Sequence, residues 1–233
     1  MVEVIKIVTI SDTHGQHHKL DIPEGDMIIH AGDSTPNGKH DDIEEFLKWY
    51  GDLNYGIKIL IAGNHDWGFE REPEKYKQEI MDSYGITYLN DSGCKFNGLN
   101  IWGSPVQPEF CNWAFNKKRT RDSIGKHWDL IPKNTDILIT HGPPALILDK
   151  CQYGGHNAGC GLLWNKIQEI KPVLHVFGHI HEGRGVVVDD KSGSPITYCN
   201  SSSLDLHYRP WKDKQFCFDW DKLLVGDSKG RDY

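Results

Sequence analysis

The sequence lacks the long apolar run of a membrane protein. No stretch approaches the roughly 18 consecutive apolar residues that a transmembrane helix needs. Residues 1–10 include Glu3 and Lys6 and have neither the basic start nor the long apolar stretch of a secretory signal peptide. We therefore expect a cytoplasmic protein with no membrane partner.

Paired cysteines and an excess of positive charge are also missing. The six cysteines include no Cys-x-x-Cys pair and are spread over more than half of the chain, which is typical of reduced cytosolic thiols. Lysine and arginine total 26 against 33 acidic residues, so the net charge is −7. Because long nucleic acids bind to basic surfaces, we expect none as a partner.

Internal repeats, low-complexity tracts and linkers long enough to separate domains are absent as well. Hydrophobic residues make up 38% of the chain, an ordinary share for a folded protein with a substantial core. We therefore predict one domain over residues 1–226, followed by a frayed tail over residues 227–233.

What the sequence does contain is a recurring pattern of apolar segments that end at polar residues. Each segment is rich in Val, Ile or Leu, as in a buried strand, and Asp, Asn or His follows within two residues. The pattern predicts five strands that deliver polar side chains at their carboxyl ends. The five segments are residues 4–10, 27–31, 57–62, 136–140 and 173–177.

Segments that suit helices lie between these strands. In the first, Ile43, Phe46 and Leu47 share one face, and in the second Pro73 suits the first helical turn. Strands that alternate with helices predict a layered α/β fold, in which ligands gather at the carboxyl ends of the strands. The three predicted helices cover residues 41–50, 73–84 and 161–170.

The second half of the chain departs from this alternation. Four further segments resemble short strands, but no long helices separate them. A second, partly antiparallel sheet explains this pattern best. The four segments are residues 88–101, 185–188, 196–200 and 215–220.

The polar residues at the strand ends are of the types that bind two metal ions. Asp12 and His14 are two residues apart, so both can face one cation, and Gly15 lets the chain turn away. His179 and His181 repeat this spacing. A two-metal hydrolytic site needs several such ligands, including a carboxylate that bridges the ions. Each motif alone arises easily by chance, whereas their ordered combination is specific.

Taken together, the motifs resemble the five sequence blocks of the calcineurin-like metallophosphoesterases. The order and the spacing match over roughly residues 5 to 205. The resemblance implies an α/β fold of four layers, an αββα sandwich with two central mixed β-sheets. The matching blocks are Asp12-Thr13-His14, Gly32-Asp33, Gly63-Asn64-His65-Asp66, His141-Gly142 and Gly178-His179-Ile180-His181.

The resemblance also implies a role for each residue. One metal would be held by Asp12, His14 and His181, the other by Asn64, His141 and His179, and Asp33 would bridge both. His65 would face the phosphate, stabilising charge or protonating the leaving oxygen, with Asp66 or a nearby acid orienting it. A water bridging the two cations would act as hydroxide and attack phosphorus in line. Mn²⁺ is expected, with Fe²⁺, Zn²⁺ or Ni²⁺ as alternatives.

The residues around the blocks narrow the expected substrate. The protein phosphatases of this superfamily carry arginines where this chain has Ala62 and the run that begins at Ser34. The segments that contain Gly103-Ser104-Pro105 and His141-Gly142-Pro143-Pro144 resemble the metallophosphoesterase-domain-containing (MPPED) group. That group is similar to class III phosphodiesterases, which act on cyclic nucleotides and aryl phosphodiesters. Some of its members have Gly at the position of His179, which weakens their second metal site. Because this chain has His179 there, we expect a complete two-metal site.

We therefore predict a metal-dependent phosphodiesterase that hydrolyses small phosphodiesters or nucleotides. The alternatives are a phosphomonoesterase or a nuclease of the same fold, or a metal-binding scaffold without activity. The oligomeric state is left open. The side chains predicted to contact the substrate are Asn64, His65, Trp67, Phe110, Trp113 and His156, although packing explains the aromatic ones equally well.

The remaining histidines and cysteines have no such context. Cys151, His156 and Cys160 suit a glycine-rich loop near the site better than a third metal site. We expect surface or structural roles for His17, His18, His30, His40, His127, His175 and His207.

Overall fold

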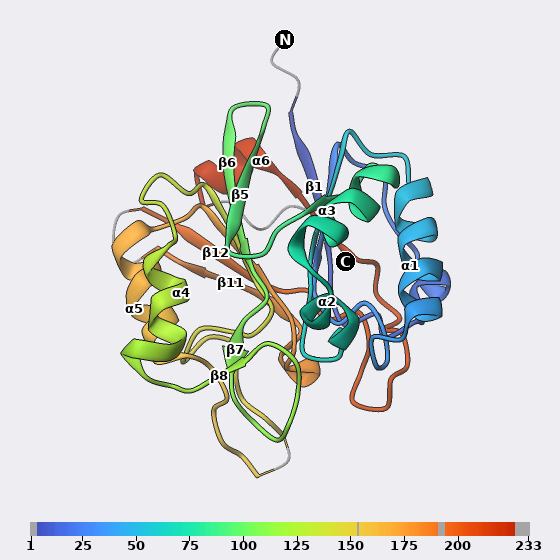
Figure 1. The fold of residues 1–233 in the computed structure, drawn as a ribbon. Coiled ribbons are helices and arrows are strands. Elements are labelled where there is room, and N and C mark those ends of the chain that lie inside the picture. The colour runs from blue at the N-terminus through green and yellow to red at the C-terminus, as the bar shows by residue number, and fades with distance from the viewer. Residues whose placement is uncertain (1–3, 153, 191–193, 227–233) are drawn as a thin grey trace.

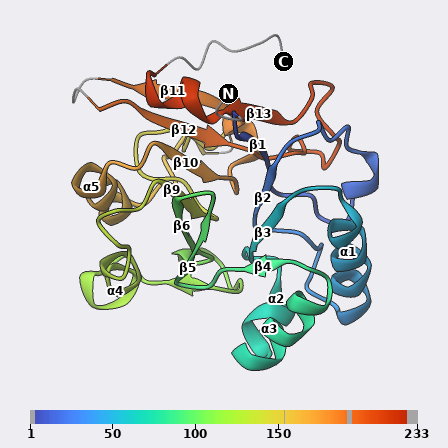
Figure 2. The ribbon, with the colours of Figure 1, turned by 90° about the horizontal axis from the view of Figure 1, so that it is seen from above.

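Two β-sheets form the centre of the molecule, and helices cover their outer faces (Figure 2). The computed structural model describes residues 4–152, 154–190 and 194–226. The predicted frayed tail at 227–233 therefore lies outside the described residues.

The first sheet has five strands in the order β13-β1-β2-β3-β4. Strands β1 to β4 run parallel, and β13 pairs antiparallel with β1 at the edge. Parallel strands bring their carboxyl ends to the same side of a sheet. The bounds are β1 Lys6–Ile10, β2 Met27–Ala31, β3 Ile57–Ile61, β4 Thr87–Tyr88 and β13 Phe216–Asp219.

The second sheet has six strands in the order β11-β12-β10-β9-β6-β5. Its four inner strands run parallel, and β5 and β11 pair antiparallel at the two edges. The bounds are β5 Ser92–Phe96, β6 Leu99–Ser104, β9 Ile137–Thr140, β10 Leu174–Phe177, β11 Gly185–Asp189 and β12 Ile196–Asn200. A separate pair of short strands consists of β7 Gln107–Pro108 and β8 Asn116–Lys117.

The apolar strands are buried on both faces, which explains why they contain almost no polar residues. In β1 and β2, Ile7 and Ile29 point into the core between the sheets, together with Ile139 and Val176 of the second sheet. Successive side chains of a strand point to opposite faces, so Val8 packs outward against the first helical layer.

Helices form the two outer layers. On the first sheet, α1 buries Phe46, Leu47 and Tyr50. On the second sheet, α5 buries Leu163 and Ile167. The layers therefore follow the order αββα, which confirms the predicted fold. The helices are α1 His40–Asp52, α2 Trp67–Arg71, α3 Glu74–Ser83, α4 Lys126–Asp129, α5 Gly161–Ile170 and α6 Trp220–Leu224.

Some predicted elements differ from those observed. Residues 88–101 were expected as one strand, but an Asn97-Gly98 turn with φ of 46° and 86° divides β5 from β6. An Asn-Gly pair favours this two-residue hairpin turn. Residues 215–220 contribute β13 to the first sheet rather than to the second. Pro73 lies just before α3 rather than within its first turn.

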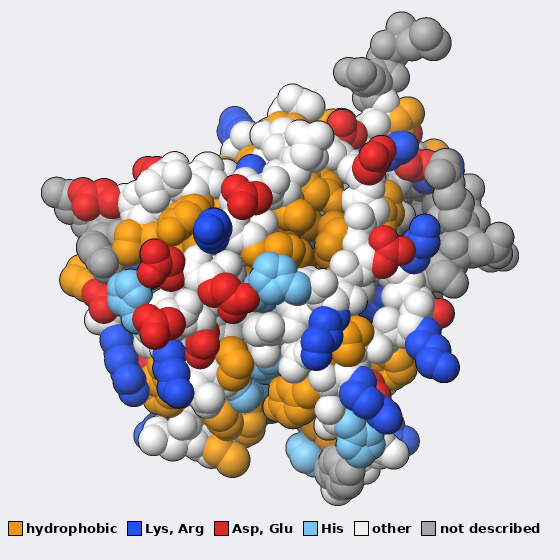
Figure 3. All heavy atoms as spheres, turned by 90° about the vertical axis from the view of Figure 1, so that its right-hand side faces the viewer, with side chains coloured by type: hydrophobic (Ala, Val, Ile, Leu, Met, Phe, Trp, Pro, Cys, Tyr) orange, Lys and Arg blue, Asp and Glu red, His pale blue; other side chains and the backbone are white. Residues whose placement is uncertain are grey.

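The surface carries charges of both signs. On the face shown in Figure 3, the acidic and basic side chains of the described residues are interspersed. This arrangement differs from the basic stripe that typically binds long nucleic acids. Among the described residues, no helix is long and apolar enough to cross a membrane.

Candidate two-metal site

Polar residues from both sheets meet at the edge where the parallel strands end. Strand β1 enters at the top of Figure 1, so this edge lies at the lower side, where β7 and β8 also lie. The first sheet contributes residues that follow β1, β2 and β3, and the second contributes residues that follow β9 and β10. The structure brings together all seven residues predicted to bind metal, namely Asp12, His14, Asp33, Asn64, His141, His179 and His181.

The first group consists of Asp12, His14 and His181. The Nε2 atoms of His14 and His181 are 3.3 Å apart, and His181 Nε2 is 3.6 Å from Asp12 Oδ1. One potential ligand atom from each residue lies within 4.8 Å of the others. This grouping is the one expected for the first metal.

The second group contains Asn64, His141 and His179. His141 Nε2 is 2.9 Å from Asn64 Oδ1, and the ring centroids of His141 and His179 are 5.0 Å apart. Together with Asp33, the two histidines place one ligand atom each within 4.8 Å of one another.

Asp33 lies between the two groups. Its Oδ2 is 3.7 Å from His14 Nε2, and its Oδ1 is 3.4 Å from His141 Nε2. The two oxygens of one buried carboxylate thus face different groups. This is the placement that a bridging ligand between two cations requires.

Hydrogen bonds to the backbone orient two of the histidines. His141 Nδ1 lies 2.9 Å from the carbonyl of Ala31, and His181 Nδ1 lies 3.1 Å from the carbonyl of Asp205. A carbonyl can only accept, so Nδ1 donates in each case and Nε2 is left to face the site. Asp12 is fixed by the hydroxyl of Ser202, which donates to its Oδ2 over 2.8 Å.

Burial and neighbouring charges divide the histidines into two pairs. Burial lowers the pKa of His14 to about 4 and that of His179 to about 3. Burial also acts to lower the pKa of His141 and His181, but the carboxylates of Asp33 and Asp12 outweigh it and raise both pKa values to about 9.

The two carboxylates respond in the opposite sense. Burial acts to raise the pKa of Asp12 and Asp33, yet the adjacent histidines hold both pKa values below the usual range. The metal-free site therefore holds protons on His141 and His181 that a cation would have to displace.

The backbone of the site is strained. The φ values of Asp12, His14, Asp33 and His179 are 53°, 41°, 55° and 70°, in the left-handed region. Each such residue costs on the order of 1–3 kcal/mol, and such strain clusters at functional sites.

Two glycines of the sequence motifs have a steric explanation. A Cβ at Gly63 would collide with the carboxylate of Asp33, and one at Gly178 would collide with that of Asp12. The chain approaches each carboxylate too closely for any side chain.

His65 lies at the edge of the ligand groups. Its Nε2 is 4.0 Å from Asp33 Oδ2, and its Nδ1 donates to the carbonyl of Pro36 over 2.7 Å. The ring of Trp113 stacks on it, with centroids 4.2 Å apart. The predicted role of Asp66 in orienting His65 is wrong, because the carbonyl of Pro36 does this.

Asp66 instead joins two of the loops that carry the site. Its carboxylate accepts hydrogen bonds from the amides of Gly63 and Thr35 and from the hydroxyl of Ser34, over 2.9 to 3.0 Å. Burial and the charge of Asp33 raise its pKa. Asp66 therefore holds together the loops that carry Asp33 and Asn64.

A cavity of about 390 Å³ opens over the ligand groups. Phe110 and His156 line it as predicted, as do Asn64 and His65. Trp67 does not line it, because Trp67 begins α2 and packs against the apolar layer beside α1, with Arg71 over its ring. The prediction that Trp67 contacts the substrate is therefore not supported.

The sequence reasoning missed Tyr208. Its ring centroid is 4.9 Å from that of His14 and 5.6 Å from that of His181, and the ring lines the cavity. Its φ is 57°, and the carboxylate of Asp205 holds the loop by accepting from the amides of His207 and Arg209. The segment lies beyond the recognised motifs, so no local signal indicated it.

Arg119 was also missed. It lines the cavity, but its two terminal nitrogens donate to the carbonyls of Ala158 and Gly159 over 2.6 and 2.7 Å. It thus fixes the glycine-rich loop to the rim. In that loop Cys160 is buried in the core while His156 lines the cavity, so this part of the described structure forms no third metal site.

The chain is similar in sequence to several known proteins. Residues 5–183 match the family model described as calcineurin-like phosphoesterase. Human metallophosphoesterase domain-containing protein 1 is 39% identical over 226 residues, which cover 88% of this chain and 68% of that protein. UPF0046 protein K07C11.7 of Caenorhabditis elegans is 34% identical over 212 residues, covering 86% and 70%.

A solved structure shows the same fold. The protein TT1561 of Thermus thermophilus superposes with a TM-score of 0.58 over 93% of this chain and 99% of its own. Its sequence identity is 16%, so the likeness concerns the fold alone.

Proposed function

The chain belongs to the calcineurin-like phosphoesterase family, and from that premise we propose that it hydrolyses small phosphodiesters with two divalent cations. The substrate class is our inference from the cavity. The main support for this substrate class is the lining of the cavity, which contains few cationic side chains and several aromatic ones.

The donor set fits two divalent ions. Asp12, His14 and His181 would hold one and Asn64, His141 and His179 the other, with the Asp33 carboxylate shared between them. Imidazole and carboxylate ligands suit Mn²⁺, Fe²⁺, Zn²⁺ or Ni²⁺, and we propose Mn²⁺. Such ions would supply an activated water and would polarise the phosphoryl oxygens.

The charge of the cavity favours a diester over a monoester. Among the described residues that line it, Arg119 is the only arginine or lysine, and its two terminal nitrogens already bind carbonyls. A monoester carries about two negative charges at neutral pH, and guanidinium forks are the usual means of binding it. A diester carries one charge and needs space for a second organic group.

Aromatic side chains in the wall of the cavity can bind this second organic group. The ring of Phe110 is 5.1 Å from that of His179, and the ring of Tyr208 is 4.9 Å from that of His14. One aromatic ring therefore stands beside each ligand group. Rings so placed can stack on a nucleobase or an aryl group, which supports a nucleotide or aryl diester as substrate.

His65 is suited to protonate the leaving oxygen. Because its Nδ1 donates to the carbonyl of Pro36, a second proton on Nε2 makes an imidazolium that faces the cavity. That proton can pass to the leaving oxygen as the ester bond breaks. Stacking on Trp113 fixes the plane of the ring during the transfer.

The test compares a diester with the matched monoester. Metal-free protein is reconstituted with Mn²⁺ and assayed with bis-p-nitrophenyl phosphate and p-nitrophenyl phosphate, then with 2′,3′- and 3′,5′-cyclic nucleotides. We expect turnover of the diesters, loss with a chelator and recovery with Mn²⁺. Preference for the monoester would overturn the substrate class, and no turnover on any ester would overturn the enzyme assignment.

A further inference from the structure

One buried histidine outside the phosphoesterase site lacks hydrogen bonds. His17 is 0% exposed, and neither of its ring nitrogens has a hydrogen-bond partner among the described residues. A buried polar group without a partner costs free energy, so nearly all such groups in folded proteins are satisfied. A cation bound to one ring nitrogen of His17 would give that nitrogen a partner.

His17 faces two further groups that can bind a metal. It begins a short 3₁₀ helix, His17–Lys19, which packs beside α1. His17 Nε2 is 3.7 Å from Glu45 Oε1, and His18 Nε2 is 2.9 Å from the same oxygen. One ligand atom from each of the three residues lies within 4.8 Å of the others.

These distances suit a single cation. Zn²⁺ binds imidazole nitrogen and carboxylate oxygen at about 2.0–2.1 Å, so two ligands of a tetrahedron are roughly 3.3 Å apart. The two measured distances fall on either side of that value. A small movement of Glu45, whose side chain is about half exposed, makes them equal.

The surroundings keep His17 in the form that binds metals. Its ring is 4.6 Å from that of Trp49 and 5.4 Å from that of Phe46, so apolar groups enclose one side. Burial, with His18 adding to it and Glu45 opposing it, lowers the pKa of His17 to about 4. The ring is therefore neutral at pH 7 and keeps a lone pair for a cation.

We propose that His17, His18 and Glu45 bind a divalent cation of the Zn²⁺ type, with water completing its coordination. Two imidazoles and one carboxylate favour Zn²⁺, Co²⁺ or Ni²⁺ over Mg²⁺ or Ca²⁺. The site is separate from the phosphoesterase centre, since none of the three residues lines the described cavity there. It joins residues 17–18 to α1, directly after the loop that carries Asp12 and His14.

The experiment measures metal uptake. Metal-free wild type, His18→Gln and Glu45→Gln are dialysed to equilibrium against Zn²⁺, and bound zinc is counted per chain by mass spectrometry. His18 and Glu45 have side chains 58% and 54% exposed, so their replacement leaves the core intact. The matched control is Glu44→Gln, which changes the neighbouring carboxylate of the same helix.

We expect wild type and Glu44→Gln to bind one zinc more per chain than His18→Gln and Glu45→Gln, or to bind it at least tenfold more tightly. The difference is the readout, so it holds whether the phosphoesterase centre binds two ions or none. Phosphoester turnover and circular dichroism of the two variants should equal those of wild type. Equal uptake and equal affinity in wild type and both variants would overturn the proposal.

Discussion

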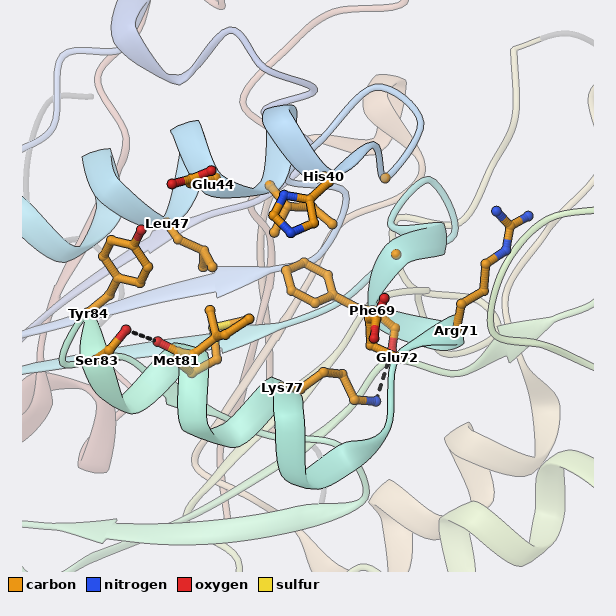
Figure 4. Close-up of a pocket in the computed structure, with 14 residues that line it drawn as sticks. His40, Glu44, Leu47, Phe69, Arg71, Glu72, Lys77, Met81, Ser83 and Tyr84 are labelled. Carbon is orange, nitrogen blue, oxygen red and sulfur yellow. Dashed lines mark hydrogen bonds between the residues drawn. The ribbon is translucent and has the colours of Figure 1, made fainter.

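Two cavities of nearly equal volume differ in their lining residues and in their backbone conformation. The cavity over the two-metal site measures about 390 Å³, and a second cavity, between α1, α2 and α3, measures about 420 Å³. Figure 4 shows Phe69, Leu47 and Met81 pointing into the second one. The first is lined by histidines and carboxylates on a strained backbone.

The helical cavity carries no comparable strain. Among the described residues that line it, only glycine has a positive φ. Lys77, one of its buried polar groups, donates to the carbonyl of Phe69 over 2.8 Å. The comparison shows that volume does not mark the functional site. Buried ligands held in costly conformations do, because selection for stability alone would remove them.

Among the substitutions that test the difference between the two cavities, His65→Ala should have the largest effect, a loss of kcat. The substitution removes the proton donor at Nε2, so kcat for a diester should fall by about 10²–10⁴-fold. Bound metal and the free energy of unfolding should stay near the wild-type values. His40→Ala, which removes a histidine from the helical cavity, is the matched control and should leave kcat unchanged. A loss of less than tenfold for His65→Ala would contradict the assigned role.

Met81→Ala tests whether the cavity between α1, α2 and α3 contributes to stability rather than to catalysis. Met81 is fully buried and packs in the first helical layer, so truncation should lower the free energy of unfolding by about 2–4 kcal/mol. Urea denaturation measures this. Turnover of the diester should change by less than about twofold. Met81→Leu conserves volume and should cost less than about 1.5 kcal/mol. If turnover of folded Met81→Ala fell tenfold, the two cavities would be coupled.

The pH dependence of stability should come from the site. In the metal-free protein His141 and His181 have a pKa raised from 6.5 to about 9, so their stabilisation is complete below pH 6.5 and is lost as pH rises to 9. His14 and His179 have lowered pKa values, so their contribution is lost as pH falls below 6.5.

Thermal unfolding in the presence of chelator should therefore show maximal stability near pH 6.5, with a loss on the order of 5 kcal/mol by pH 9. Added Mn²⁺ should remove the alkaline loss, because the cation replaces the protons on these histidines. Met81→Ala should shift the whole curve downward without changing its shape. If the stability of the metal-free protein did not change between pH 6.5 and 9, the carboxylates of Asp33 and Asp12 would not raise the pKa of His141 and His181.

The smallest effect is expected from Tyr208→Ala. Loss of one stacking surface should raise KM for an aryl or nucleotide diester by about tenfold, while kcat is kept. Tyr208→Phe retains the ring and should behave like wild type. Steady-state kinetics on both variants test this. An equal effect of both substitutions would assign the role to the hydroxyl group instead of the ring.

Local patterns carried most of the predictive value. The bounds of β2 and α5 agree with those expected, because an apolar run and a 3.6-residue periodicity each need only neighbouring residues. The seven candidate ligands were predicted from the order of the motifs and their resemblance to a known family, and the structure brings them together. In contrast, Tyr208 was missed and Asp66 was given the wrong role, because their contacts join segments far apart in the chain.

The sequence by itself determined the main strands, the main helices and the residue types at the strand ends, since apolar runs and helical periodicity are properties of neighbouring residues. Only the tertiary structure decided that β13 joins the first sheet, that Asp33 faces both ligand groups, that Pro36 orients His65, and that Glu45 meets His17 and His18. Each of these depends on contacts between elements far apart in the chain. The free energy of such contacts depends on both partners, so no single segment of the sequence predicts it.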